Sequence, residues 1–152
     1  MKEAFIVGAV RTPVGKKNGS LSSFRPDELL GTVLKEVVQR VGVDPALVED
    51  VVGGTVTQVG EQGFTLPRMG ALAAGFPDDT PGVAINRQCG SSLTALSFAA
   101  AEIIAGWRDC VIACGCEIMS RYSIAAEWSN LTLSNGKRAG MPFGAAYLNR
   151  TG

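Results

Sequence analysis

The sequence predicts a layered α/β fold with a mixed, mainly parallel sheet. Short β-like apolar runs alternate with helical segments, and the connections between them are short, which is typical of this class. Of the 152 residues, 46% are hydrophobic and 18% are charged. That composition provides enough apolar side chain to bury a sizeable core and argues against a disordered chain.

The first predicted elements are a strand over residues 4–10 and, after a turn-rich stretch, one amphipathic helix. Apolar residues recur at helical spacing from Leu29 to Val41, while the opposite face is charged or polar. Pro26 before this pattern and Gly42 after it are typical boundary residues of a helix. We therefore expect this helix to pack on one side.

The next five elements are expected in the order strand, helix, strand, helix, strand, over residues 48–56, 66–74, 83–85, 90–105 and 110–115. Residues 90–105 are small and apolar on nearly all sides, which predicts a helix buried on every side. From residue 121 onward the pattern becomes irregular, with an Asn135-Gly136 turn. We therefore predict a domain over residues 1–120 and the beginning of a loop region over residues 121–152.

Charge and hydropathy exclude several classes of partner. Lysine and arginine number 14 and so do aspartate and glutamate, so the chain has no net charge to attract nucleic acid or an anionic membrane surface. No apolar stretch approaches the ~18 residues of a membrane-spanning helix, and residues 1–10 do not resemble an export signal. A cytoplasmic protein with reduced thiols is the expectation.

Histidine is absent from the sequence. The usual general base at neutral pH, the commonest metal ligand and every Ser-His or Cys-His pair are therefore missing from these residues. Any chemistry that needs an imidazole must obtain it from elsewhere.

Cys89 is the candidate catalytic residue, because it lies on a turn between a predicted strand and a predicted helix. A thiol at a helix N-terminus feels the positive end of the helix dipole, and free backbone N–H groups nearby can bind an oxyanion. The alternative is that Cys89 is a small buried hydrophobic residue.

Other patterns favour structural roles. Cys110, Cys114 and Cys116 alternate onto one face of a strand and are expected to pack as hydrophobic side chains, since their spacing does not fit a zinc site. Glu117 and Met119 are expected to be structural anchors. A phosphate-binding loop and a dinucleotide-binding glycine motif are both missing, so no cofactor or metal is predicted.

Four collinear segments resemble the thiolase family, the acetyl-CoA C-acyltransferases. The most specific is the run Asn-Arg-Gln-Cys-Gly-Ser-Ser-Leu-Thr-Ala-Leu at residues 86–96, which resembles the acyl-enzyme cysteine signature of that family. The turn at residues 11–15, the strand and loop at residues 53–60 and the strand ending at residues 109–120 also resemble thiolases. Membership of the ketoacyl synthases is a weaker interpretation, because the residues around their nucleophile differ from the Asn-Arg-Gln-Cys run at residues 86–89.

The resemblance implies the N-terminal half of a thiolase fold and Claisen chemistry on coenzyme A thioesters. Cys89 would be the acyl-accepting nucleophile, with its backbone N–H in an oxyanion hole. Coenzyme A thioesters would be substrates and no cofactor would be needed, although the coenzyme A contacts are not assigned. Lys137 and Arg138 could meet its phosphates, but a solvated loop pair is the commoner reading. The family also implies a homodimer or homotetramer of complete chains.

The sequence also departs from the family pattern. In thiolases a histidine, a second catalytic cysteine and an asparagine come from a homologous second half, and Cys114 and Cys116 do not replace that cysteine. The loop at residues 61–68 differs from the usual one, and Phe64 is expected to reshape it. We therefore expect a chain that is incomplete for catalysis and that exposes an apolar face toward a missing half. The alternative is a non-catalytic binding or assembly module that pairs with a separate chain.

Overall fold

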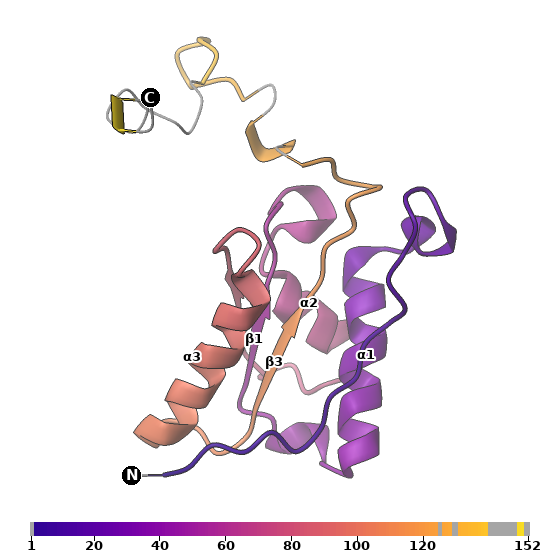
Figure 1. Cartoon of the computed structure of the whole chain (residues 1–152), viewed down its shortest axis with the longest axis vertical. Coiled ribbons are helices and arrows are strands. Elements are labelled where there is room, and N and C mark those ends of the chain that lie inside the picture. Colours follow the sequence, from indigo (N-terminus) through magenta and orange to yellow (C-terminus); the bar gives the residue numbers. More distant parts are fainter. Residues whose placement is uncertain (1, 125, 129–130, 140–148, 151–152) are drawn as a thin grey trace.

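A computed structural model shows a sheet with helices on both faces (Figure 1). It describes residues 2–124, 126–128, 131–139 and 149–150. The described strands are β1 (Asp50–Gly54), β2 (Gly82–Ile85) and β3 (Val111–Gly115), in the order β2-β1-β3. Both pairs of neighbouring strands are parallel, and Val52 of β1 lies opposite Val83 of β2 and Ala113 of β3. The predicted layered α/β class is confirmed.

Helices α1 (Pro26–Val41) and α2 (Leu66–Ala73) cover one face of the sheet. The core between them contains Leu30, Leu34, Val51 and Leu66, each no more than 2% exposed. Helix α1 begins and ends as predicted: Pro26 is its first residue, and Gly42 follows it with a φ of 75°, a left-handed conformation that favours glycine.

Helix α3 (Ser91–Ala105) covers the opposite face and packs Ala95 and Ala99 against Val52 of β1. The prediction that this helix is buried on every side was wrong for this structure, because Leu93 is 71% exposed and Phe98 is 46% exposed. The physical reason is that a sheet covers only one side of a helix. A second layer outside α3 would be needed to bury the remaining apolar side chains.

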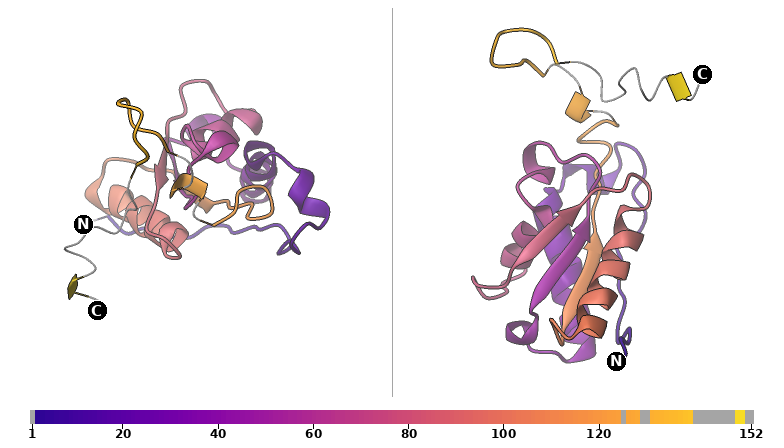
Figure 2. Two further views of the ribbon diagram at one scale, coloured as in Figure 1. Left: turned by 90° about the horizontal axis from the view of Figure 1, so that it is seen from above. Right: turned by 90° about the vertical axis from the view of Figure 1, so that its left-hand side faces the viewer.

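Residues 4–10 are extended but do not form the predicted strand. A strand is defined by hydrogen bonds to a neighbour, and these residues make no backbone–backbone hydrogen bond to any described residue. Phe5, Ile6 and Val7 are each more than 70% exposed. Figure 2 shows this segment, in indigo, passing along the body near α3 and β3 without joining the sheet.

Beyond β3 the described residues form short elements, namely a 3-10 turn at Ala126–Trp128, a bridge between Thr132 and Arg138 around the predicted turn at Gly136, and helical residues 149–150. Three further 3-10 turns occur earlier, at Ser20–Ser23, Pro45–Leu47 and Gly60–Gln62. The domain boundary after residue 120 stays a prediction.

Within the described residues, no helix has the length and hydropathy required to span a bilayer.

Candidate active site

Cys89 lies on the turn that joins the end of β2 to the beginning of α3, as the sequence predicts. Its thiol is free, and the residue is exposed to solvent together with Asn86, Arg87 and Gln88. The alternative that Cys89 is a buried hydrophobic residue is therefore wrong for this structure. A molecule in solution can reach its sulfur.

The turn around Cys89 is held by side-chain hydrogen bonds. Ser91 Oγ accepts a hydrogen bond from the backbone N–H of Arg87 at 2.9 Å and donates one to the carbonyl of Gln88 at 2.6 Å. Asn86 Oδ1 accepts from the N–H of Gln88 at 2.9 Å, while Asn86 Nδ2 donates to the carbonyl of Val56 at 2.9 Å. These bonds hold Gln88 at a φ of 49°, in the left-handed region that non-glycine residues rarely adopt.

The first turn of α3 lies close to the sheet because two strands end in glycine. A Cβ atom added at Gly54 would lie 2.4 Å from the backbone nitrogen of Ser92, and one added at Gly115 would lie 1.9 Å from Ser92 Oγ. Both distances are far shorter than any real contact of a Cβ atom. The two glycines therefore allow the N-terminus of α3, and with it Cys89, to sit directly at the carboxyl ends of β1 and β3.

Glu117 anchors the loop after β1 to the chain after β3. Its carboxylate accepts hydrogen bonds from the backbone N–H groups of Val56 at 2.8 Å and Thr57 at 3.3 Å, and from Gln62 Nε2 at 2.9 Å. The buried Gln62 completes the link, because its Oε1 accepts from the N–H of Ile118 at 2.6 Å. The structural role predicted for Glu117 is confirmed, whereas Met119, predicted as a second anchor, is 54% exposed.

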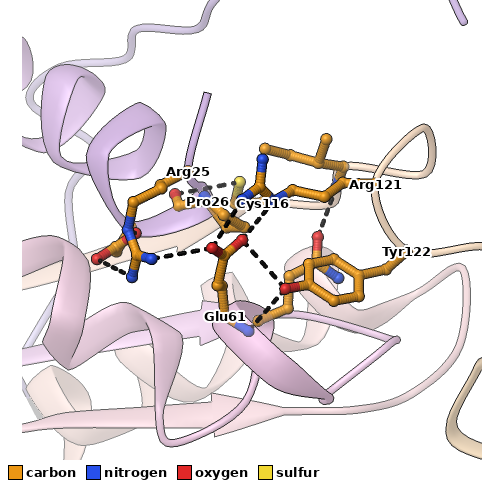
Figure 3. A network of polar contacts seen from close by, with 9 residues as sticks. Arg25, Pro26, Glu61, Cys116, Arg121 and Tyr122 are labelled. Atoms are coloured by element: carbon orange, nitrogen blue, oxygen red, sulfur yellow. Dashed lines mark hydrogen bonds and ion pairs between the residues drawn. The ribbon is translucent and has the colours of Figure 1, made fainter. Parts of the chain in front are cut away.

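Glu61 joins three segments in a polar network that sequence reasoning missed (Figure 3). Its carboxylate pairs with Arg25 at 2.9 Å and with both Nε and Nη2 of Arg121, the latter at 2.7 Å. The hydroxyl of Tyr122 donates to the carboxylate at 3.1 Å and accepts from the N–H of Glu61 at 2.8 Å. The hydrogen bonds from Arg121 are the main reason why the pKa of Glu61 is lowered.

The other cysteines are structural, as predicted. Cys110, Cys114 and Cys116 pack with Ile112 against the core on the α1 side of the sheet. Burial raises the pKa values of the Cys114 and Cys116 thiols to about 12, and it also raises that of Cys110. Across the described residues, no three His, Cys, Asp or Glu side chains are placed so that they could bind one metal ion.

Residues 4–147 match the family model for the N-terminal domain of thiolase. The chain belongs to the thiolase family. Among its relatives are a steroid 3-ketoacyl-CoA thiolase of Mycobacterium tuberculosis, 41% identical over 126 residues, and a 3-oxoadipyl-CoA/3-oxo-5,6-dehydrosuberyl-CoA thiolase of Escherichia coli, 46% identical over 122 residues. The match covers 83% and 80% of this chain, but only 31% and 30% of those two thiolases.

The fold agrees with that of a solved acetyl-CoA acetyltransferase. The crystal structure of the Bacillus anthracis acetyl-CoA acetyltransferase superposes with a TM-score of 0.77 and 38% identity, and the match covers 90% of this chain and 33% of that one. The chain thus spans about a third of the length of the thiolases that it matches.

The different surroundings of the thiols in this thiolase domain lead to a first prediction. Because Cys89 is exposed and burial raises the pKa values of Cys110, Cys114 and Cys116, iodoacetamide should alkylate Cys89 faster than the other three thiols. Mass spectrometry of peptides after labelling from about pH 5 to 9 measures this order. Equal rates at all four cysteines would contradict the difference in burial between Cys89 and the other three thiols.

Proposed function

We propose that this chain is the N-terminal domain of a thiolase-type acyltransferase, which transfers acyl groups between coenzyme A thioesters through an acyl-enzyme on Cys89. The reaction is the Claisen condensation of acetyl-CoA or the reverse thiolysis of a 3-ketoacyl-CoA. This proposal rests on the position of Cys89. The residue is exposed to solvent and lies at the N-terminus of α3, on a turn that is held by side-chain hydrogen bonds. The names of the relatives, which are acyl-CoA thiolases, support the choice of substrate class.

The proposed first step is a thiol exchange on the acyl carbon. The Cys89 thiol loses its proton to a base, Sγ attacks the thioester carbonyl, and the C–S bond to coenzyme A breaks. The proton passes to the departing thiolate of coenzyme A, so the acyl group moves without oxidation or reduction. The N–H of Cys89 is the proposed donor to the oxyanion that forms during the attack, with the dipole of α3 adding positive potential.

The base for this step is supplied from outside these residues, because the chain has no histidine. Cys114 and Cys116 do not take its place, since burial raises both of their pKa values to about 12. We therefore propose that the histidine and the second cysteine come from the thiolase polypeptide that the matched relatives have beyond this domain. The proposed active form is a cytoplasmic homodimer or homotetramer, and it needs no cofactor because the substrates arrive already activated as thioesters.

The experiment is to incubate the chain with acetyl-CoA in the presence of a complementing polypeptide. We define this as the part of the Escherichia coli thiolase that follows the stretch matched by this chain. An acetyl group found by mass spectrometry on the peptide that contains Cys89, and absent from Cys110, is the expected result. Stable association with no acyl adduct under any condition would favour the non-catalytic assembly module instead.

A further inference from the structure

The peptide unit that joins Gln88 to Cys89 is held on its carbonyl side by Ser91. The carbonyl oxygen of Gln88 accepts one hydrogen bond from the backbone N–H of Ser91 at 3.1 Å and another from Ser91 Oγ at 2.6 Å. Ser91 is the first residue of α3. The carbonyl of Gln88 therefore points toward the beginning of that helix.

The N–H of the same peptide unit belongs to Cys89. In a trans peptide the C=O and N–H bonds lie in one plane and point in opposite directions, and the peptide bond between Gln88 and Cys89 is trans. Since the carbonyl points toward Ser91, the N–H of Cys89 points away from α3. It makes no backbone–backbone hydrogen bond to a described residue, and Cys89 is exposed, so an acceptor from solution can reach this N–H.

The hydroxyl of Ser91 has both of its functions in use. It accepts a hydrogen bond from the backbone N–H of Arg87 at 2.9 Å, and its own proton goes to the carbonyl of Gln88. Ser91 is 4% exposed, so bulk water does not compete for these bonds. A hydrogen bond to a carbonyl also polarises its amide, which strengthens the donor on the nitrogen. The hydroxyl of Ser91 thus acts on both the direction and the strength of the Cys89 N–H.

We propose that Ser91 is a positioning residue, which aims and polarises the N–H of Cys89 as the donor to the oxyanion of acyl transfer. Ser91 is buried behind the turn, so it acts through Cys89 and not on the substrate. This inference rests on the proposed function, because the oxyanion forms only when the sulfur of Cys89 attacks a thioester carbonyl.

Two reactions of the same sulfur separate this role from simple support of the turn. Acyl transfer from acetyl-CoA places negative charge on the carbonyl oxygen, which an aimed N–H stabilises. In alkylation by iodoacetamide, Sγ forms a bond to the CH2 carbon while the C–I bond breaks and iodide leaves, so no oxyanion forms. Loss of the aimed N–H should therefore slow the first reaction and spare the second.

The test is to measure both rates at Cys89 in the variant Ser91→Ala, in the complex with the complementing polypeptide. Acetylation is expected to slow by about 10-fold to 100-fold at saturating acetyl-CoA, with the KM and the alkylation rate changed by no more than about twofold. Ser91→Thr keeps the hydroxyl and is expected to recover most of the acetylation rate. Slow alkylation of the packed Cys110 in the same sample shows that a variant is folded.

Ser97→Ala is the matched control, because it also removes a hydroxyl from α3 that donates to a backbone carbonyl, that of Leu93 at 3.1 Å. Both rates are expected to stay unchanged in this variant. Equal acetylation by Ser91→Ala and Ser97→Ala would overturn the proposal. An equal loss of acetylation and alkylation in Ser91→Ala would also overturn it, since Ser91 would then support the thiol and not the N–H.

A measurement on the unaltered chain completes the test without any variant. The residual dipolar coupling of the Cys89 N–H, measured by NMR, reports the direction of that bond, and a direction toward α3 would refute the role of Ser91. The unaltered complex also separates the two proposals. If it does not acetylate Cys89, both proposals fail, whereas acetylation that does not depend on Ser91 refutes this inference alone.

Discussion

Replacement of Cys89 by serine is expected to lower acyl transfer by about 10³-fold or more in the complex with the complementing polypeptide. Serine has nearly the same shape, so the turn and its hydrogen bonds remain. Its hydroxyl is a much weaker nucleophile than a thiolate, and its oxygen ester is a poorer acyl donor in the second step. The measurement is the rate of acetoacetyl-CoA thiolysis, followed through loss of the 3-ketoacyl-CoA.

The matched control is Cys110→Ala, which changes a thiol that is packed against the core and lies at the opposite end of β3. This variant is expected to keep the rate of the unaltered chain. Full activity in Cys89→Ser would disprove the role assigned to Cys89. Equal losses in both variants would show that the assay reports folding and not catalysis.

Replacement of Gly54 by alanine is expected to destabilise the domain by about 3 kcal/mol. The new Cβ would lie 2.4 Å from the backbone nitrogen of Ser92 and 2.6 Å from the backbone carbon of Ser91, and backbone atoms cannot rotate away as the end of a side chain can. Helix α3 must therefore shift away from β1, which also displaces Cys89. Urea unfolding followed by circular dichroism gives the free energy of unfolding.

Gly15→Ala is the control for this second prediction, because a Cβ at Gly15 would meet its nearest neighbour, Leu21, at an ordinary 3.5 Å. Its effect on the free energy of unfolding is expected to stay within about 1 kcal/mol. If Gly54→Ala were as stable as Gly15→Ala, the close approach of α3 to the sheet would not be a property of the folded domain.

Local signals made most of the fold predictable from the sequence. Pro26 and Gly42 mark the two ends of α1, and both lie where the structure begins and ends that helix. Residues 4–10 have the composition of a strand but lack a strand's hydrogen bonds, since pairing depends on a neighbour that these residues do not themselves encode. The exposure of one side of α3 could not be predicted for a similar reason. Periodicity shows which faces of a helix are apolar, but it does not show what covers them.

The candidate site was predictable only in part. The position of Cys89 follows from the order of strand, turn and helix, which is a local pattern. The bonds that link Glu117 to Gln62, and Glu61 to Arg121, join residues 55 and 60 positions apart, and no periodicity connects such pairs. Gly54 and Gly115 could be seen in the sequence, but only the structure shows that both of them face Ser92.

The left-handed backbone of Gln88 stores conformational energy beside the candidate nucleophile. A non-glycine residue in this region costs about 1 kcal/mol or more, and two hydrogen bonds offset that cost: the N–H of Gln88 donates to Asn86 Oδ1, and Ser91 Oγ donates to the carbonyl of Gln88. A substitution that let the turn at Gln88 relax would therefore give a more stable domain, but it would also move the candidate nucleophile Cys89 away from its present position.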